Sequence, residues 1–207
     1  MEHNNDMYKK AYTQHLLHLA ALKGMLRSRE LEETGIPRIY LTRLIATGQL
    51  EKVGRGIYRP PETPVSEYES LTLIAKKVPQ AIFCLLSALQ FHELTTQLPH
   101  QVWIALPQGS HAPQIGYPPI KMILYSGEAY AKGIELYEQD NVTLRVYSVA
   151  KTIIDCFKHR NKIGLDVVVE ALKDAWTHKK VTIDELWHYA KICRVTNVIR
   201  PYLEVLQ

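Results

Sequence analysis

Four side chains between residues 37 and 46 have the chemistry of a surface that reads DNA. Arginine can grip guanine O6 and N7 or a phosphate, and threonine and tyrosine hydroxyls can bond phosphates or base edges. At this spacing we expect the four side chains to face outward from one short helix, of a length that fits the major groove. The predicted base-reading residues are Arg38, Tyr40, Thr42 and Arg43.

A second set of cations surrounds the sequence Gly54-Arg55-Gly56. Two glycines around one arginine allow a tight turn to approach a sugar-phosphate backbone closely. Residues 37–60 include five basic residues and one acidic residue, a net charge of +4 that equals the net charge of the whole chain. Because the rest of the chain is balanced, DNA binding is favoured over a packing unit with solvated charges. The predicted phosphate-binding residues are Lys52, Arg55 and Arg59.

The elements that must hold these side chains are those of a winged helix-turn-helix over residues 28–59. Ser28 suits the cap of a first helix, Gly35 suits a turn with positive φ, and Pro37 suits the start of a second helix. A hairpin at the end of this segment forms the wing, and a preceding amphipathic helix over residues 8–23 covers the motif. The apolar residues expected to face the core from the second helix are Ile36, Leu41, Leu44 and Ile45.

Length and composition predict two domains in a cytoplasmic protein. The chain has 207 residues, of which 46% are hydrophobic, enough for a packed core. Three prolines within residues 60–64 break regular structure, so we expect a winged helix-turn-helix domain over residues 1–62 and a second domain over residues 63–207. No apolar run approaches the roughly 20 residues that span a bilayer, and no secretory signal opens the chain. The odd number of well-separated cysteines favours buried thiols over disulfides or a metal site: Cys84, Cys156 and Cys193.

The second domain has the pattern of an α+β fold, so the expected fold class of the chain is mixed α/β. Short apolar or alternating runs predict strands over residues 102–106, 120–125 and 142–147. Apolar residues at three- and four-residue spacing predict helices over residues 67–77, 81–94 and 129–137, and four more helices after residue 148. A small sheet with helices packed on it follows.

No arrangement of residues with catalytic chemistry stands out, so we expect a protein that is not an enzyme and needs no metal or other cofactor. The sequence lacks a phosphate-binding loop, an HExxH motif, paired CxxC motifs and a GxSxG motif. Its predicted strands also lack the carboxylates with which a nuclease holds Mg²⁺. Lys151 and Asp155 lie one helical turn apart among apolar residues, which favours a partly buried ion pair over a catalytic pair.

Two stretches of the second domain, residues 87–110 and 146–175, resemble the AbiEi-type antitoxins of type IV toxin-antitoxin systems. That family carries a winged helix-turn-helix before its antitoxin domain, and residues 8–59 and the region from Pro64 onward follow the same order. The family usually has histidine and glycine after the second apolar helix of the antitoxin domain, where this chain has a histidine and Glu93. The most specific part of the resemblance is the string Lys151-Thr152, Asp155, Arg160-Asn161-Lys162 and Gly164-Leu165-Asp166.

The resemblance implies a transcriptional autorepressor that binds the double-stranded DNA of its own operator. It also implies that the second domain counteracts a nucleotidyltransferase-type toxin without forming a stable complex with it. The main alternative is a winged-helix regulator whose second domain senses a small ligand in a pocket between its strands and helices. A DNA-modifying enzyme is the less favoured alternative. The candidate antitoxin residues, which can present a charged patch unless the first two are consumed by pairing with each other, are Lys151, Asp155, Arg160 and Lys162.

Overall fold

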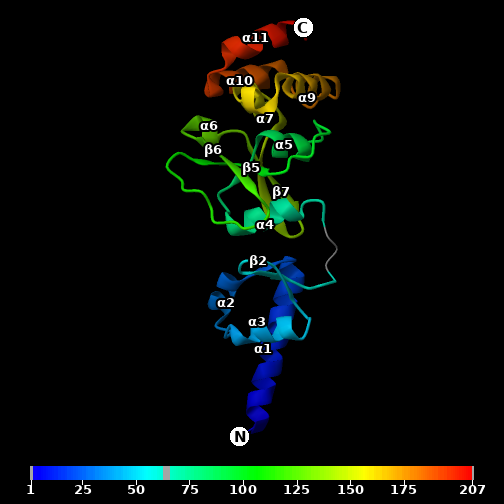
Figure 1. Ribbon diagram of the computed structural model, residues 1–207, viewed down its shortest axis with the longest axis vertical. Coiled ribbons are helices and arrows are strands. Elements are labelled where there is room, and N and C mark those ends of the chain that lie inside the picture. Colours follow the sequence, from blue (N-terminus) through cyan, green and yellow to red (C-terminus); the bar gives the residue numbers. More distant parts are fainter. Residues whose placement is uncertain (1, 63–65, 207) are drawn as a thin grey trace. The chain divides into compact units, whose positions relative to one another are not determined.

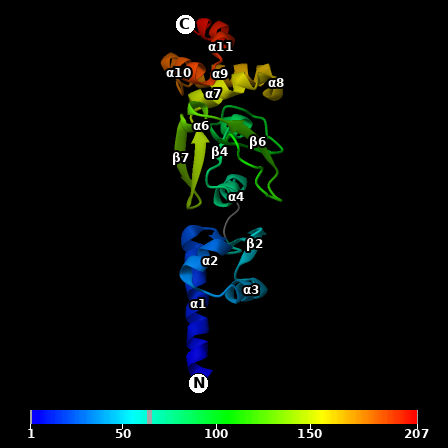
Figure 2. The same ribbon diagram turned by 90° about the vertical axis from the view of Figure 1, so that its left-hand side faces the viewer.

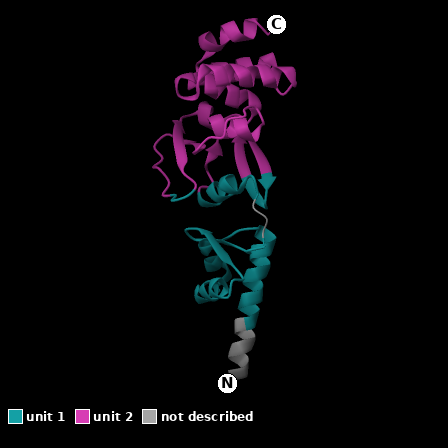
Figure 3. Ribbon diagram, turned by 45° about the vertical axis from the view of Figure 1, so that its right-hand side comes forward, with its two compact units in different colours: residues 1–77, 115–117, 138–143 teal, residues 78–114, 118–137, 144–207 magenta. Residues whose placement is uncertain are grey.

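The computed structural model describes residues 2–62 and 66–206, with side chains from Lys10 onward (Figures 1 and 2). The chain divides into two compact units, which Figure 3 shows in teal and magenta. The first unit comprises Met1–Lys77, Ile115–Tyr117 and Glu138–Thr143. The second unit comprises Val78–Gln114, Pro118–Tyr137 and Leu144–Gln207. The mixed α/β class expected from the sequence is confirmed.

The first unit contains a helix-turn-helix followed by a β-hairpin, as expected for a winged helix-turn-helix. The sequence did not predict β1, which pairs with β3 and completes a three-stranded antiparallel sheet in the order β1-β3-β2. In chain order its elements are α1 (Glu2–Lys23), β1 (Leu26–Arg27), α2 (Ser28–Thr34), α3 (Ile39–Ala46), β2 (Glu51–Gly54), β3 (Ile57–Arg59) and α4 (Glu69–Lys77).

Apolar side chains from α1, α2 and α3 form the core of the winged part of this unit. Gly35 takes the left-handed φ of 68° that the turn between α2 and α3 requires. Ile45, expected in the core, is instead 36% exposed, whereas Leu50 after the helix is buried in the core with Leu44. The buried core residues are Leu16, Ala20, Leu26, Leu31, Ile36, Leu41, Leu44 and Leu50.

The start of α2 differs from the expectation that Ser28 caps it. Ser28 is the first helical residue, and its hydroxyl lies 3.5 Å from the carbonyl oxygen of Gly56. The Glu30 carboxylate instead accepts a hydrogen bond from the Arg27 backbone N–H at 2.7 Å. An acid in the first turn of a helix can therefore satisfy the backbone just before it from within the helix.

Helix α4 packs on the wing within the first unit. Leu73 of α4 lies in one apolar cluster with Met25 and with Ile57 of β3. The ammonium of Lys76 donates to the carbonyl oxygen of Met25 at 3.0 Å.

The expected domain boundary after residue 62 adjoins residues 63–65, which lie outside the described residues, so the division into residues 1–62 and 63–207 stays a prediction.

A five-stranded sheet in the order β6-β5-β4-β8-β7 carries the helices of the second unit. Strands β5 and β6 are parallel, β4 and β8 are parallel, and β4 and β5 are antiparallel. Figures 1 and 2 show α7, α9, α10 and α11 stacked beyond one end of this sheet. The strands and early helices are β4 (Ile82–Phe83), α5 (Leu85–Phe91), β5 (Val102–Pro107), β6 (Ile120–Tyr125), α6 (Glu128–Ala131), β7 (Ile134–Gln139) and β8 (Val142–Tyr147). The remaining helices are α7 (Val149–Lys158), α8 (Arg160–Ile163), α9 (Leu165–Thr177), α10 (Ile183–Cys193) and α11 (Thr196–Glu204).

Two of these strands replace expected helices. The first two residues after Ala81, expected within a helix over residues 81–94, form the central strand β4, in which Phe83 pairs with both β5 and β8. Of the helix expected over residues 129–137, only residues 129–131 are helical, within α6, and the chain then continues as the edge strand β7. Positive φ angles of 51° and 58° at Asp140 and Asn141 form the two-residue turn that joins β7 to β8.

Helix α7 is the centre of the second unit. Every residue from Ala150 to Phe157 is buried, because α5, α9 and α10 all pack around this helix. Ser148 caps its start by accepting a hydrogen bond from the backbone N–H of Lys151 at 3.3 Å. Such a helix is expected to be apolar all round, so a charged residue within it needs an internal partner.

None of the helices over the described ranges is both long and apolar enough to cross a lipid bilayer.

Candidate nucleic-acid interface and a buried charge cluster

Three of the four predicted base-reading residues are exposed: Arg38, which comes just before α3, and Thr42 and Arg43 within α3. The fourth, Tyr40, is half-buried, and its ring packs edge-on against Tyr12 of α1 with centroids 5.2 Å apart. The Arg43 guanidinium carbon lies 5.3 Å from the Tyr40 ring centroid. The Tyr40 ring therefore stabilises the position of the Arg43 guanidinium through a cation–π contact.

Arg38 differs from Arg43 in having a carboxylate partner. Its guanidinium forms an ion pair with Glu32 of α2, and both side chains are well exposed. Exposed pairs of this kind contribute only about 0–1 kcal/mol. Arg38 can therefore exchange Glu32 for a phosphate oxygen at small energetic cost.

The wing presents Lys52 and Arg55 at the surface. Arg55 and Gly56 form the turn between β2 and β3, and Gly56 takes a φ of 72° there. Lys77 of α4 lies beside the wing, since its ammonium would be 3.4 Å from a Cβ atom added at Gly54. Burial lowers the pKa of Lys77, and the positive charge of Arg55 lowers it further. Lys77 thus adds a cation that the sequence placed in the other domain.

Arg59 faces into the first unit, contrary to the expectation that it binds a phosphate. The residue is 9% exposed, and its guanidinium donates to Glu51 at 2.5 Å and to Glu69 of α4 at 2.6 Å. Burial alone would lower the pKa of Arg59, but the two carboxylates raise it overall. The structure therefore corrects the expectation for Arg59, which ties the wing to α4.

Replacing Arg59 by alanine is expected to loosen the wing without changing the number of phosphates bound. The variant loses two charge-assisted hydrogen bonds and leaves Glu51 and Glu69 unpaired, a cost of about 1.5–3 kcal/mol. Hydrogen exchange of the β2 and β3 amides should become faster, while the salt dependence of DNA binding keeps its slope. If the slope of log affinity against log salt concentration is instead lowered by about one, Arg59 binds a phosphate as the sequence predicted.

Lys151 and Asp155 form an ion pair in the middle of the second unit, and both side chains are 0% exposed. The Lys151 ammonium lies 4.1 Å from the Tyr147 ring centroid and 4.9 Å from the Tyr125 ring centroid. The thiol of Cys193 donates to the other Asp155 oxygen at 3.3 Å. The pair is therefore more deeply buried than the sequence suggested, and it is held by aromatic faces and a thiol as well as by its own charges.

The groups around this pair stay uncharged. Burial raises the pKa of the Cys84 and Cys156 thiols, and it raises the pKa of Cys193 to about 12. Burial and the Asp155 charge likewise raise the pKa of the Tyr125 and Tyr147 hydroxyls. The expectation of three buried free thiols is confirmed, and protonated thiols are poor nucleophiles.

The predicted patch of four charged antitoxin residues does not form as one surface. Lys151 and Asp155 are enclosed, whereas Lys162 of α8 is exposed and Arg160 is half-buried. The Arg160 guanidinium donates to the carbonyl oxygen of Phe157 at 3.1 Å, which fixes it at the end of α7. Of the four residues, only Arg160 and Lys162 can meet a partner.

The second unit is expected to lose stability as the pH falls below neutral, because burial lowers the pKa of two of its histidines. Burial lowers the pKa of His92, whose Nε2 lies 2.7 Å from the carbonyl oxygen of Tyr147. Burial also lowers the pKa of His159, and the nearby lysines lower it further. The unfolded chain then binds protons more readily, so this contribution is present above the ordinary histidine pKa and is lost as the pH falls through the lowered value.

Urea unfolding at about pH 7.5 and about pH 5.0 measures this effect. Tryptophan fluorescence reports on the second unit alone, because it contains all three tryptophans of the chain: Trp103, Trp176 and Trp187. The urea concentration at the unfolding midpoint should be lower at about pH 5.0 than at about pH 7.5. The difference between the two midpoints should be smaller in a His159→Gln variant. Equal midpoints at the two pH values would contradict the prediction.

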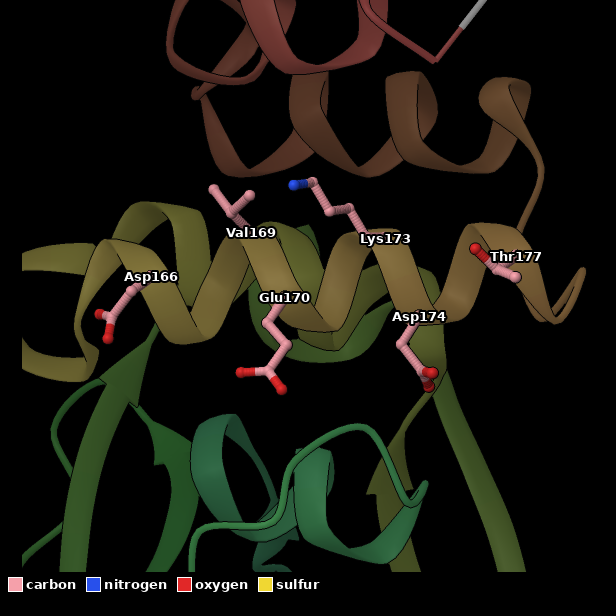
Figure 4. Close-up of a pocket in the computed structure, with 6 residues that line it drawn as sticks. All are labelled: Asp166, Val169, Glu170, Lys173, Asp174 and Thr177. Carbon is pink, nitrogen blue, oxygen red and sulfur yellow. The ribbon is translucent and has the colours of Figure 1, made fainter.

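One side of α9 carries three acidic residues at four-residue intervals. Figure 4 shows Asp166, Glu170 and Asp174 pointing the same way from the helix, while Lys173 points to the opposite side. These residues line an open cavity of about 430 Å³. The Asp174 carboxylate oxygen Oδ1 also lies 3.1 Å from Nδ1 of His178. Over the described ranges no three histidine, cysteine or acidic side chains are arranged to hold a metal ion. The three carboxylates make this face of α9 a negatively charged surface.

A helix-turn-helix with a basic wing, joined to an α+β unit, defines a class of protein in which one half has the features of a DNA-binding module. The comparisons with known proteins agree with this class. Residues 14–61 match the family described as transcriptional regulator, AbiEi antitoxin, so the resemblance seen in the sequence is confirmed over this segment.

Most of the chain has a counterpart among solved structures. The crystal structure of the RV2827C protein from Mycobacterium tuberculosis is similar with a TM-score of 0.58. The match covers 87% of this chain and 71% of that chain, at 14% sequence identity, and it therefore shows a shared fold alone. No curated protein matches the sequence.

Proposed function

We propose that this protein is a DNA-binding transcriptional autorepressor and the antitoxin of a type IV toxin-antitoxin system, and that it counteracts a nucleotidyltransferase-type toxin. The observation that carries the DNA-binding half is the exposed face of α3 beside a basic wing. The match of residues 14–61 to a family of transcriptional regulators supports the same half. The operator of its own operon is the proposed target.

The charges on this surface are available for DNA. Among the residues with described side chains, Arg43, Lys52 and Arg55 have no carboxylate partner within ion-pair distance. Arg43 is presented on the ring of Tyr40, so it loses less conformational freedom on binding than a free arginine. We propose that Arg43 and Thr42 read base edges, that Arg38 and the wing cations hold phosphates, and that Lys77 adds to the wing.

The antitoxin half of the proposal rests on the name of the matched family and on the string in α7, α8 and α9. The buried Lys151 and Asp155 cannot touch a toxin, so the proposed acting surface is formed by Arg160 and Lys162 of α8. We expect this surface to act without a stable complex. The acidic face of α9 makes the second unit a poor ligand for DNA, because carboxylates repel phosphates.

Co-expression with a nucleotidyltransferase toxin tests both halves in the same cells. Arg43→Ala should lose repression of a reporter under the protein's own promoter and keep protection of growth. Arg160→Ala with Lys162→Ala should lose protection of growth and keep repression. The proposed division of labour is wrong if each variant loses both activities while remaining folded.

A specific cavity favours one other function, a regulator that senses a small ligand. A cavity of about 580 Å³ in the second unit is lined mainly by apolar groups, among them Trp176, Val181 and Ile183. Such a cavity has the size and lining of many ligand sites. A compound that shifts the thermal unfolding of the protein and also changes its affinity for operator DNA would support this function over the antitoxin.

A further inference from the structure

One apolar side chain lies at the centre of the surface that we propose reads DNA. Ile39, the first residue of α3, is 52% exposed. An α-helix turns by about 100° per residue, so Ile39 shares one face with Thr42, Arg43 and Ala46. All four side chains are exposed. Ile39 has the middle position between Arg43 on one side and Thr42 on the other.

The exposure of Ile39 is not a by-product of poor core packing. The opposite face of α3 is well buried, since Leu41 is 4% exposed and Leu44 is 1% exposed. A β-branched side chain is also stiff at χ1, so Ile39 holds its methyl groups in one direction. What distinguishes Ile39 from other exposed apolar residues is its place beside Thr42 and Arg43, where a stiff side chain has a fixed position toward any partner that this face binds.

The chemistry of the major groove supplies a partner for this group. Thymine carries a C5-methyl group there, and apolar side chains discriminate thymine by contact with it. The residues at the start of a recognition helix are the ones that reach base edges. Arg43 lies on the same helix face as Ile39, and the wing of the same unit exposes Lys52 and Arg55, which is charge that suits a phosphate backbone and not another apolar protein surface.

We propose that Ile39 is a specificity residue that reads the methyl group of a thymine in the operator. This inference rests on the proposed DNA-binding function and gives it a base preference: a thymine near the bases contacted by Thr42 and Arg43. Ile39 itself adds no charge, so it changes which sequences are bound and leaves the salt dependence of binding unchanged.

Replacement of single thymines by uracil tests the proposal, because uracil differs from thymine only by the missing methyl group. The full-length protein is first used to select duplexes from a random pool. Each thymine of the selected duplex is then replaced by uracil in turn, and affinities are measured by fluorescence anisotropy. At one or more positions of the selected sequence the parent protein should bind uracil about fourfold more weakly than thymine, the effect of one buried methyl group.

Variants of the two exposed isoleucines of α3 provide the comparison. Ile39→Ala should bind thymine and uracil duplexes equally, and Ile39→Val should keep most of the discrimination. Ile45→Ala is the matched control, since Ile45 is also exposed, at 36%, but lies away from the reading face. It should discriminate against uracil as the parent does.

Three results would overturn the inference. If the pool yields a selected sequence but no thymine responds to uracil, Ile39 does not read a methyl group, although the proposed DNA-binding function stands. The same holds if Ile39→Ala keeps the discrimination and instead changes the sedimentation of the free protein, because the face is then an interface between two copies. If no sequence is enriched at all, the proposed function fails together with the inference.

Discussion

Replacing Asp155 by alanine is expected to lower the free energy of unfolding of the second unit by about 3–5 kcal/mol, because the Lys151 ammonium is then buried without a counter-charge. Both side chains are 0% exposed, so water cannot take the place of the carboxylate unless the core opens. The rings of Tyr147 and Tyr125 still face the ammonium, but cation–π contacts contribute only about 0.5–2 kcal/mol. Urea unfolding followed by tryptophan fluorescence should show a much lower midpoint.

The double variant Lys151→Met with Asp155→Leu is the matched control, since it also lacks the Asp155 carboxylate. Apolar replacement of a buried ion pair is often neutral or stabilising, so the midpoint should stay close to that of the parent. Exchange of the two charges is expected to remain destabilising. A carboxylate at position 151 would face the negative faces of two tyrosine rings, and an ammonium at position 155 could not accept the hydrogen bond that the Cys193 thiol donates.

Growth protection by the stable double variant shows whether the pair has any role beyond folding. We expect protection to be retained, because neither side chain reaches the surface. An unchanged midpoint in Asp155→Ala would contradict the structural role. Loss of protection by a double variant that unfolds like the parent would instead return Lys151 and Asp155 to the antitoxin function.

Replacing Arg43 by alanine is expected to weaken operator binding by about 1–3 kcal/mol, roughly 5- to 150-fold, and to relax the base preference at one position. Arg43 lies on the outward face of α3, supported by Tyr40. The matched variant Arg55→Ala, on the wing, should weaken binding to all DNA about equally. It should also lower the slope of log affinity against log salt concentration by about 0.9. Gel shifts of operator and unrelated DNA across a salt series separate the two effects.

Arg200→Ala supplies the control for loss of one positive charge. Arg200 is exposed in α11 of the second unit, so its loss should change neither the affinity nor the salt slope. If Arg43→Ala and Arg55→Ala both bind operator DNA like the parent, α3 and the wing are not the DNA surface. If all three variants weaken binding equally, the affinity follows net charge and not a built site.

The sequence was most informative where local backbone chemistry decides the structure. Gly35 and Gly56 mark the turn of the helix-turn-helix and the tip of the wing, and both take the positive φ that these positions require. The alternating run of β8 likewise shows in the sequence. The match over residues 14–61 bears out the family resemblance in the same region.

The sequence was least informative where residues that are far apart in the chain determine the local structure. Ile82 and Phe83 read as helix because a short apolar run fits either structure, and only pairing with β5 and β8 makes them a strand. Arg59 read as a phosphate ligand because its partner Glu69 lies ten residues away, beyond a segment rich in proline. The depth of the Lys151–Asp155 pair depends on Tyr125, Tyr147 and Cys193, which the chain brings together from different elements.

The packing of α4 on the wing limits where this chain can be joined to another protein. Leu73 covers Ile57 of the wing, and Glu69 holds Arg59, although α4 follows the proline-rich segment that reads as a linker. A chimaera joined within that segment would leave an apolar side chain and a buried cation of the wing uncovered. A hybrid protein that transfers the proposed DNA-binding unit to a new partner should therefore be joined after Lys77, so that α4 stays with the wing that it covers.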